Sequence, residues 1–135
     1  MAAAKTEAKA RAHGPLVVER RGPVLIVGLD RPHKRNAIDD ATIEALEQIF
    51  SDLPAEARAV VLHGVGPNFS AGLDLNGVGD RDVAAAVNHS RAWHRCFEKI
   101  EFGPVPVVAV LRGAVIGGGL ELAAAAHIRV SDPSA

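Results

Sequence analysis

Apolar segments of two different periodicities alternate along the chain, and this alternation restricts the possible fold more than any other feature. Residues 24–29, 59–62 and 105–111 are short runs rich in β-branched residues and bounded by turn residues, which is typical of buried strands. Between these runs, in residues 39–53 and 82–102, apolar side chains recur at helical spacing. Strands that alternate with helices predict the α/β class.

The boundaries of the elements follow from local chemistry. Residues 16–19 and 24–29 predict a hairpin around Arg20-Arg21-Gly22-Pro23. Asp39 can cap the first helix and Pro54 ends it. The second helix is expected to begin near Asp82 and to end at Gly103-Pro104. Its predicted apolar stripe consists of Val83, Val87, Trp93, Phe97 and Ile100. A glycine-rich turn over 113–119, a short helix over 120–126 and a strand over 128–130 complete the prediction.

Composition excludes several classes of protein. A chain of 135 residues is long enough for one domain, and its net charge of -1 recommends neither a nucleic acid nor an acidic membrane as partner. Arg112 and Glu121 interrupt the most apolar stretch, so no membrane-spanning helix is expected. The single cysteine, Cys96, fits a reducing compartment and a cytoplasmic location. Residues 1–15 are expected to form a loose N-terminal arm before a domain over 16–135.

A triple-glycine turn stands where the strand over 105–111 leads into the last helix. The backbone N–H groups of Gly117, Gly118 and Gly119 are free of side-chain cover at a helix N-terminus, which favours a negative charge. The turn is therefore either an oxyanion donor or a tight packing turn. Glu121 follows it, either as a carboxylate close to a bound group or as a first-turn glutamate favoured by the helix dipole.

Residues 69–75 offer a second set of exposed amides, because Ala71 and Gly72 add almost no bulk between Phe69 and Leu75. Amides from two loops can together form an oxyanion hole. Ser70 is not expected to be a nucleophile, since Asn68 replaces the first glycine of that motif.

A basic cluster precedes Asn36, and it is either a phosphate-binding site or a solvated turn. The cluster consists of Arg31, His33, Lys34 and Arg35. The six histidines include no helical pair with metal-ligand spacing, so no metal site is predicted.

Three motifs in this order resemble the enoyl-CoA hydratase/isomerase (crotonase) superfamily. They are Arg31-Pro32-His33-Lys34-Arg35-Asn36-Ala37-Ile38, then Phe69-Ser70-Ala71-Gly72-Leu73-Asp74-Leu75, then Pro106-Val107-Val108-Ala109-Val110-Leu111-Arg112-Gly113 leading to Gly117-Gly118-Gly119-Leu120-Glu121-Leu122. The resemblance covers about residues 16–132. It implies the N-terminal turns of a ββα superhelix, the spiral core of the family.

The resemblance also implies a thioester site. The amides of Ala71 and Gly118 would hold the carbonyl oxygen and stabilise an enolate. The acyl-CoA would pass Arg35, Ala37 and Ile38 and then the segment Ala71, Gly72, Leu73, Asp74 and Leu75. Glu121 matches one of the two hydratase glutamates. No cofactor is implied, because coenzyme A is part of the substrate, and complete members of the family form trimers or hexamers.

The activity implied is that of a lyase of fatty-acid or related acyl-CoA metabolism, which adds water across the 2,3 double bond. The second hydratase glutamate would lie beyond Ala135, so the chain resembles an N-terminal portion with apolar faces left uncovered. Alternatives are an enoyl-CoA isomerase, another enolate-forming member, or a non-catalytic CoA-binding module. Uncovered apolar faces predict partial unfolding or aggregation unless a partner covers them. A sharp, cooperative melt of the monomer would count against this prediction.

Overall fold

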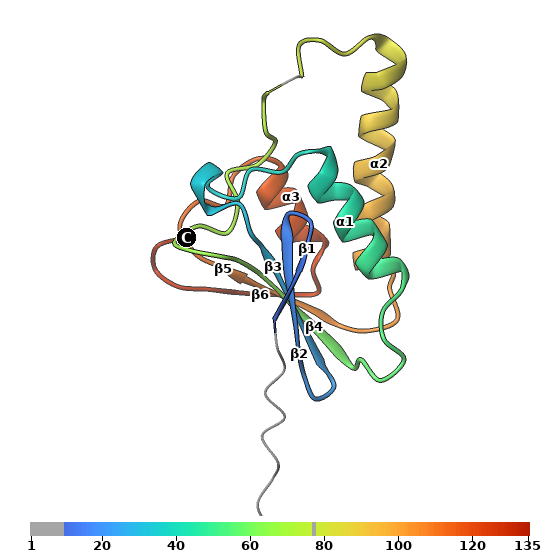
Figure 1. Ribbon diagram of the computed structural model, residues 1–135. Coiled ribbons are helices and arrows are strands. Elements are labelled where there is room, and N and C mark those ends of the chain that lie inside the picture. The colour runs from blue at the N-terminus through green and yellow to red at the C-terminus, as the bar shows by residue number, and fades with distance from the viewer. Residues whose placement is uncertain (1–9, 77) are drawn as a thin grey trace, which may run out of the picture.

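The computed structural model describes residues 10–76 and 78–135 and contains one six-stranded sheet in the order β1-β2-β3-β4-β5-β6 (Figure 1). The first three strands pair antiparallel and the last four, from β3 onward, pair parallel. The strands are β1 (Arg11–His13), β2 (Leu16–Arg21), β3 (Val24–Leu29), β4 (Ala59–Gly64), β5 (Val107–Leu111) and β6 (Ile128–Ser131). The predicted α/β class is confirmed.

Helices connect the parallel strands. They are α1 (Asp40–Ser51), α2 (Val83–Glu101) and α3 (Gly118–Ala125), preceded by a 3-10 turn, η1 (Pro32–Lys34). The Asp39 carboxylate accepts a hydrogen bond from the Thr42 N–H at 2.9 Å, and Asp82 accepts one from the Ala85 N–H at 2.7 Å. The predicted cap at Asp39 is therefore confirmed, and Asp82, near which the second helix was expected to begin, caps α2 in the same way. Each carboxylate satisfies a donor that the first helical turn leaves free.

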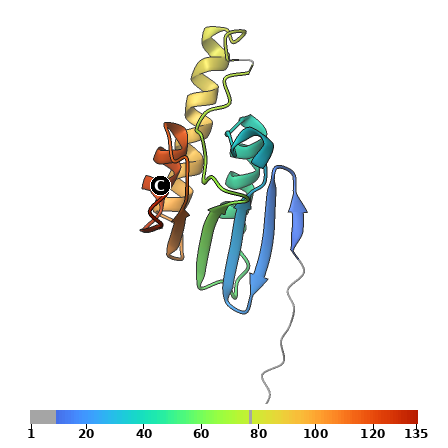
Figure 2. The same ribbon diagram turned by 90° about the vertical axis from the view of Figure 1, so that its left-hand side faces the viewer.

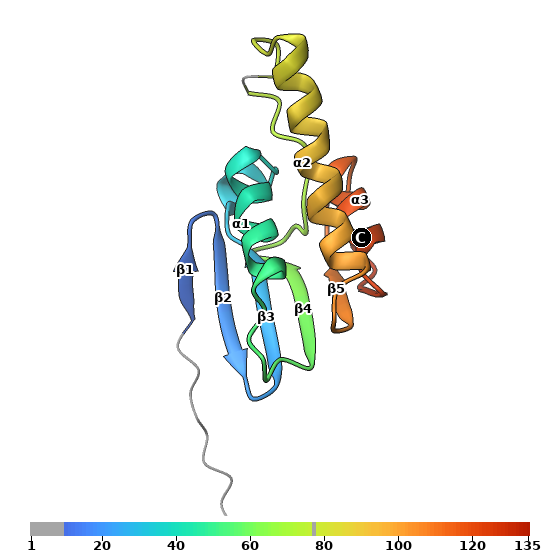
Figure 3. The same cartoon turned by 90° about the vertical axis from the view of Figure 1, so that its right-hand side faces the viewer.

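The core lies between the helices and one face of the sheet. Figure 3 shows α1 and α2 side by side in front of the strands. Alternate strand residues point toward them, since side chains along a strand alternate between the two faces. The fully buried members include Val27, Leu29, Val60, Leu62, Val107 and Ala109 from the sheet, and Ile43, Leu46, Cys96, Ile100 and Leu122 from the helices.

The opposite face of the sheet, which we call the outer sheet face, is mostly apolar, and its side chains are half-buried or exposed. Two rows of paired residues cross it, Glu19-Ile26-Val61-Val108-Ile128 and Val17-Gly28-His63-Val110-Val130. At its β6 end the side chains of Ile128 and Val130 are 53% and 54% exposed. This agrees with the expectation that apolar faces are left uncovered.

The structure corrects the prediction for the N-terminal arm and shows how far the apolar stripe on α2 is buried. Residues 11–13 are not part of a loose arm: they form β1 and pair with β2, because Gly14 at a φ of 60° turns the chain back on itself. Residues 1–9 lie outside the described part. The stripe on α2 is also only half buried. Trp93 and Ile100 are in the core, whereas Val83 is 82% exposed because the first turns of α2 extend past the other elements (Figure 1).

The third helix begins at Gly118, two residues before the predicted start, so the glycine turn itself forms the helix N-terminus. Figure 2 shows α3 and the C-terminus on the far side of α2 from β1 and β2. Among the described residues, no helix is long and apolar enough to cross a membrane.

Candidate functional site

The two glycine motifs come together at the N-terminus of α3, as the sequence predicted. A Cβ added to Gly118 would lie 3.5 Å from the Leu73 nitrogen. One added to Gly72 would lie 3.2 Å from the Gly118 nitrogen and 2.5 Å from the Ile116 carbonyl oxygen. The two segments are therefore in contact, and Gly72 has no room for a side chain.

The amide of Ala71 is not an oxyanion donor in this arrangement, and that prediction is corrected. Its N–H donates to the Arg35 carbonyl oxygen at 2.9 Å and is therefore already occupied. The amide of Leu73 is the one beside Gly118. Asp74 N–H donates to the Ile38 carbonyl at 2.8 Å, and successive amides of an extended segment point in opposite directions, so Leu73 N–H points away from Ile38.

Gly118 supplies the other candidate donor. It is the first residue of α3, where the backbone N–H has no partner within the helix and the helix dipole favours negative charge. Within residues 10–76 and 78–135, neither the Leu73 N–H nor the Gly118 N–H donates to another group. Two unoccupied amides of neighbouring segments are the arrangement that an oxyanion needs.

Ser70 holds the loop that carries Leu73. Its side chain is fully buried, its Oγ donates to the Asn36 carbonyl at 2.7 Å, and the same Oγ accepts from the Gly72 N–H at 3.1 Å. Its backbone bonds to Ala114 and Ile116 on the approach to α3. Ser70 is thus a structural residue, in agreement with its exclusion as a nucleophile.

Asn36 anchors the other side of the same loop, and sequence reasoning missed it. Its Oδ1 accepts from the Arg31 N–H at 2.9 Å, while its Nδ2 donates to the carbonyls of Val65 and Asn68 at 3.0 and 2.8 Å. Its φ of 54° is left-handed, a conformation that asparagine tolerates better than most residues. That preference was the only local signal.

The predicted basic cluster separates into two parts. Arg31 is used inside the fold: its guanidinium bonds Asp74 at 2.9 Å and the Ala37 carbonyl at 2.6 Å, and lies 3.2 Å from Asp39. The hydrogen bond from Asn76 N–H, followed by that from Arg31, lowers the pKa of Asp74. His33, Lys34 and Arg35 are exposed around η1 and remain accessible to a ligand.

Other predicted site residues differ in their accessibility. Ile38 is fully buried and forms a parallel bridge with Leu73, Ala37 is half-buried, and Leu75 is exposed. Glu121 is exposed in the first turn of α3, three residues after Gly118. In the described part of the chain its carboxylate has neither an ion pair nor a hydrogen bond. It is therefore accessible for proton transfer near the glycine turn.

Trp93 also belongs to this site, although the sequence marked it only as a core residue. A Cβ on Gly118 would lie 2.5 Å from both Cη2 and Cζ3 of its indole, so the ring packs directly on the glycine. The side chain is 8% exposed, and among the described residues its Nε1 has no hydrogen-bond partner. Helical periodicity alone cannot separate such a position from ordinary core.

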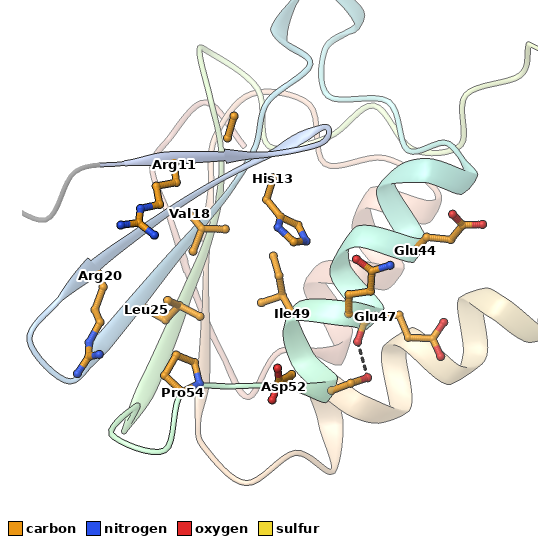
Figure 4. Close-up of a pocket in the computed structure, with 13 residues that line it drawn as sticks. Arg11, His13, Val18, Arg20, Leu25, Glu44, Glu47, Ile49, Asp52 and Pro54 are labelled. Carbon is orange, nitrogen blue, oxygen red and sulfur yellow. Dashed lines mark hydrogen bonds between the residues drawn. The ribbon is translucent and has the colours of Figure 1, made fainter.

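A cleft of about 1280 Å³ lies elsewhere, between β1, β2 and α1 (Figure 4). Arg11, His13 and Arg20 line its sheet side, while Glu44, Glu47 and Asp52 line its helix side. None of the predicted site residues contributes to it. The described residues contain no group of three side chains that could hold a metal ion.

Comparisons with known proteins agree with this geometry. A model of the family described as enoyl-CoA hydratase/isomerase matches residues 19–135. The mitochondrial Delta(3,5)-Delta(2,4)-dienoyl-CoA isomerase of Homo sapiens is 38% identical over 120 residues, which cover 78% of this chain and 36% of that protein.

Two crystal structures are similar to the whole described fold. A provisionally named enoyl-CoA hydratase from Rhodopseudomonas palustris CGA009 has a TM-score of 0.88 and 54% identity, covering 95% of this chain and 50% of that one. Another, from Thermobifida fusca YX in complex with acetoacetyl-CoA, has a TM-score of 0.77 and 29% identity, covering 89% and 51%. The chain thus spans about half, or less, of the length of these relatives.

Proposed function

Because the chain belongs to the enoyl-CoA hydratase/isomerase family, we propose that it binds an acyl-CoA thioester and stabilises an enolate with the amides of Leu73 and Gly118. The observation that carries this proposal is the pair of unoccupied N–H groups on two segments in contact. Charge moves onto the thioester oxygen as an enolate forms, so fixed donors at that oxygen stabilise the transition state more than the bound substrate.

We assign the acid-base step to Glu121. Its carboxylate would take a proton from a water molecule as the water attacks the 3-position of a 2-enoyl thioester, which leaves an enolate. Delivery of that proton from Glu121 to the 2-position of the enolate completes the hydration and restores the carboxylate. The exposed position of Glu121 beside the glycine turn supports this role.

The coenzyme end of the substrate would lie near η1. His33, Lys34 and Arg35 are exposed there, and their side chains suit phosphate groups, whereas Arg31 is already bound to Asp74. Ile38 and the segment from Ala71 to Leu75 connect this cluster to the donors. The complex of the Thermobifida fusca relative with acetoacetyl-CoA supports an acyl-CoA ligand.

Assembly and location are further parts of the proposal. We expect a homotrimer or hexamer, which would cover part of the exposed apolar surface. We also propose a cytoplasmic location, which the single buried and unpaired Cys96 supports.

The test is hydration of crotonyl-CoA by the wild type and by Glu121→Gln, with Glu98→Gln, an exposed carboxylate on α2, as the matched control. We expect E121Q to lower turnover by about 10²- to 10⁴-fold while binding of acetoacetyl-CoA is kept. Turnover of a 3-enoyl-CoA by the wild type, in place of hydration, would favour an isomerase. Binding without any turnover would leave a CoA-binding module, and no binding would reject the proposal.

A further inference from the structure

We infer that Trp93 is a specificity-determining residue, whose indole closes the acyl end of the site and restricts the ligand to short acyl groups. The inference rests on the proposed acyl-CoA function. It concerns a residue on α2, outside the three motifs that point to the oxyanion donors. The following contacts carry it.

The indole lies directly beside the donors. Its benzo edge packs on the α-carbon of Gly118, and the Leu73 nitrogen lies 3.5 Å from the position of a Cβ on that same glycine. A carbonyl oxygen held by both amides therefore places the attached acyl carbons close to the ring. The space on this side of Gly118 is already filled by aromatic atoms.

The indole is also held in place. His89 lies one helical turn before Trp93 and Phe97 one turn after it, and both rings have their centroids 5.7 Å from that of the indole. His89 in turn bonds the Asp40 carboxylate at 2.7 Å, and Arg81 bonds the same carboxylate at 2.8 Å. Rotation of the indole out of the site would disturb these contacts. The indole of Trp93 is therefore held in one orientation beside the donors.

The unpartnered Nε1 shows what the indole contributes. A buried N–H without an acceptor lowers stability, so hydrogen bonding does not explain a tryptophan at this position. What remains is the flat shape and the area of the ring. A flat aromatic surface accommodates a short planar enoyl group, whereas a long chain meets the ring. Replacement of Trp93 by phenylalanine removes none of the hydrogen bonds among the described residues, so that variant is expected to fold.

The first experiment uses the fluorescence of the wild-type chain. Trp93 is the only tryptophan and the chain has no tyrosine, so its emission reports on this position alone. We expect saturating butyryl-CoA to change the emission and unacylated CoA to leave it nearly unchanged, with binding of both followed independently by calorimetry. An unchanged emission at calorimetric saturation with butyryl-CoA would overturn the inference.

The second experiment compares chain lengths. We expect the wild type to bind butyryl-CoA more tightly than dodecanoyl-CoA, and Trp93→Val and Trp93→Phe to shift this preference toward dodecanoyl-CoA, Val by about tenfold. Phe102→Val, at an exposed aromatic after the end of α2, is the matched control. Binding with an unchanged preference in the folded variants overturns this inference alone. Failure of every CoA compound to bind the wild type overturns the proposed function as well.

Discussion

In the donor loop, residues 68–74, long-range hydrogen bonds fix the backbone, whereas the outer edge of β6 pairs with no other described strand. Asn36, Ser70 and Arg31 connect the donor loop to segments about 30 to 40 residues away in sequence, and all three side chains are buried or nearly so. The β6 strand bonds β5 on one side and exposes Ile128 and Val130. Contacts within the chain therefore fix the conformation of the donor loop, whereas β6 leaves apolar side chains exposed.

This difference between the donor loop and β6 means that the geometry of the site does not depend on whether the outer sheet face is covered. The positions of Leu73 and Gly118 depend on contacts from β3 to α3, all of which are present in the described residues. Exposed apolar residues lie on β6, at the start of α2 and on the outer sheet face, and also beside the donors, at Leu75, Ile116 and Leu120. Changes in the donor loop should therefore affect folding and ligand binding together, whereas changes at β6 should affect association.

The largest effect is expected from Gly72→Ala. Gly72 has a φ of 92°, and a Cβ there would lie 2.5 Å from the Ile116 carbonyl oxygen. Both strain and steric clash oppose the change, so we expect the free energy of unfolding to fall by about 3–5 kcal/mol in urea denaturation. Gly79→Ala is the control, since a Cβ there has no atom of the described residues within 4 Å. Equal stability of the two variants would show that the donor loop is not fixed as described.

Much of this fold could be predicted, because its elements depend on local signals. The β-branched runs, the cap at Asp39, the start of the second helix near Asp82 and the glycine turn are all visible in the sequence. The β1 strand was missed because a three-residue strand has too short a pattern, and only its pairing with β2 defines it.

The site was predicted less completely, for a physical reason. The amide of Ala71 is occupied because it faces Arg35, whereas the amide of Leu73 points away from Ile38 and is free. These orientations depend on pairing with a distant segment, which the local sequence does not predict. The partners of Asn36 and Arg31 are long-range in the same way. Motifs therefore located the two donor segments, and only the structure distinguished the free amide from the occupied one.

A smaller effect is expected from Ile128→Lys combined with Val130→Lys on β6. Both side chains are about half exposed, so the double variant should change the free energy of unfolding by roughly 0.5 kcal/mol or less. It should also reduce self-association, because charged residues block edge-to-edge pairing of strands and interrupt the apolar face. Sedimentation velocity at several concentrations measures the association. A loss of stability as large as that of Gly72→Ala would mean that the stability of the fold depends on the side chains of β6 as strongly as on the donor loop.

The smallest effects concern one carboxylate in each region, Asp74 in the donor loop and Asp132 after β6. The pKa of Asp74 is lowered by the Asn76 N–H and then by Arg31, and that of Asp132 by the hydroxyl and N–H of Ser134 and then by Arg112. A lowered pKa stabilises the folded state fully above about pH 4, and this stabilisation is lost as the pH falls through the folded-state pKa. Both carboxylates therefore contribute to acid sensitivity.

The two contributions should nevertheless differ, because the side chains of Asp74 and Arg31 are only 10% and 18% exposed, whereas those of Asp132 and Arg112 are about half exposed. Solvent screens the ion pair of Asp132 and Arg112 more strongly, so the loss of that pair lowers the free energy of unfolding by less. We expect Asp74→Asn to flatten the decrease in unfolding free energy between about pH 5 and pH 3 more than Asp132→Asn does. Urea denaturation across that range measures both slopes. Equal flattening would show that the donor loop gains no more from its ion pair than the end of the sheet does.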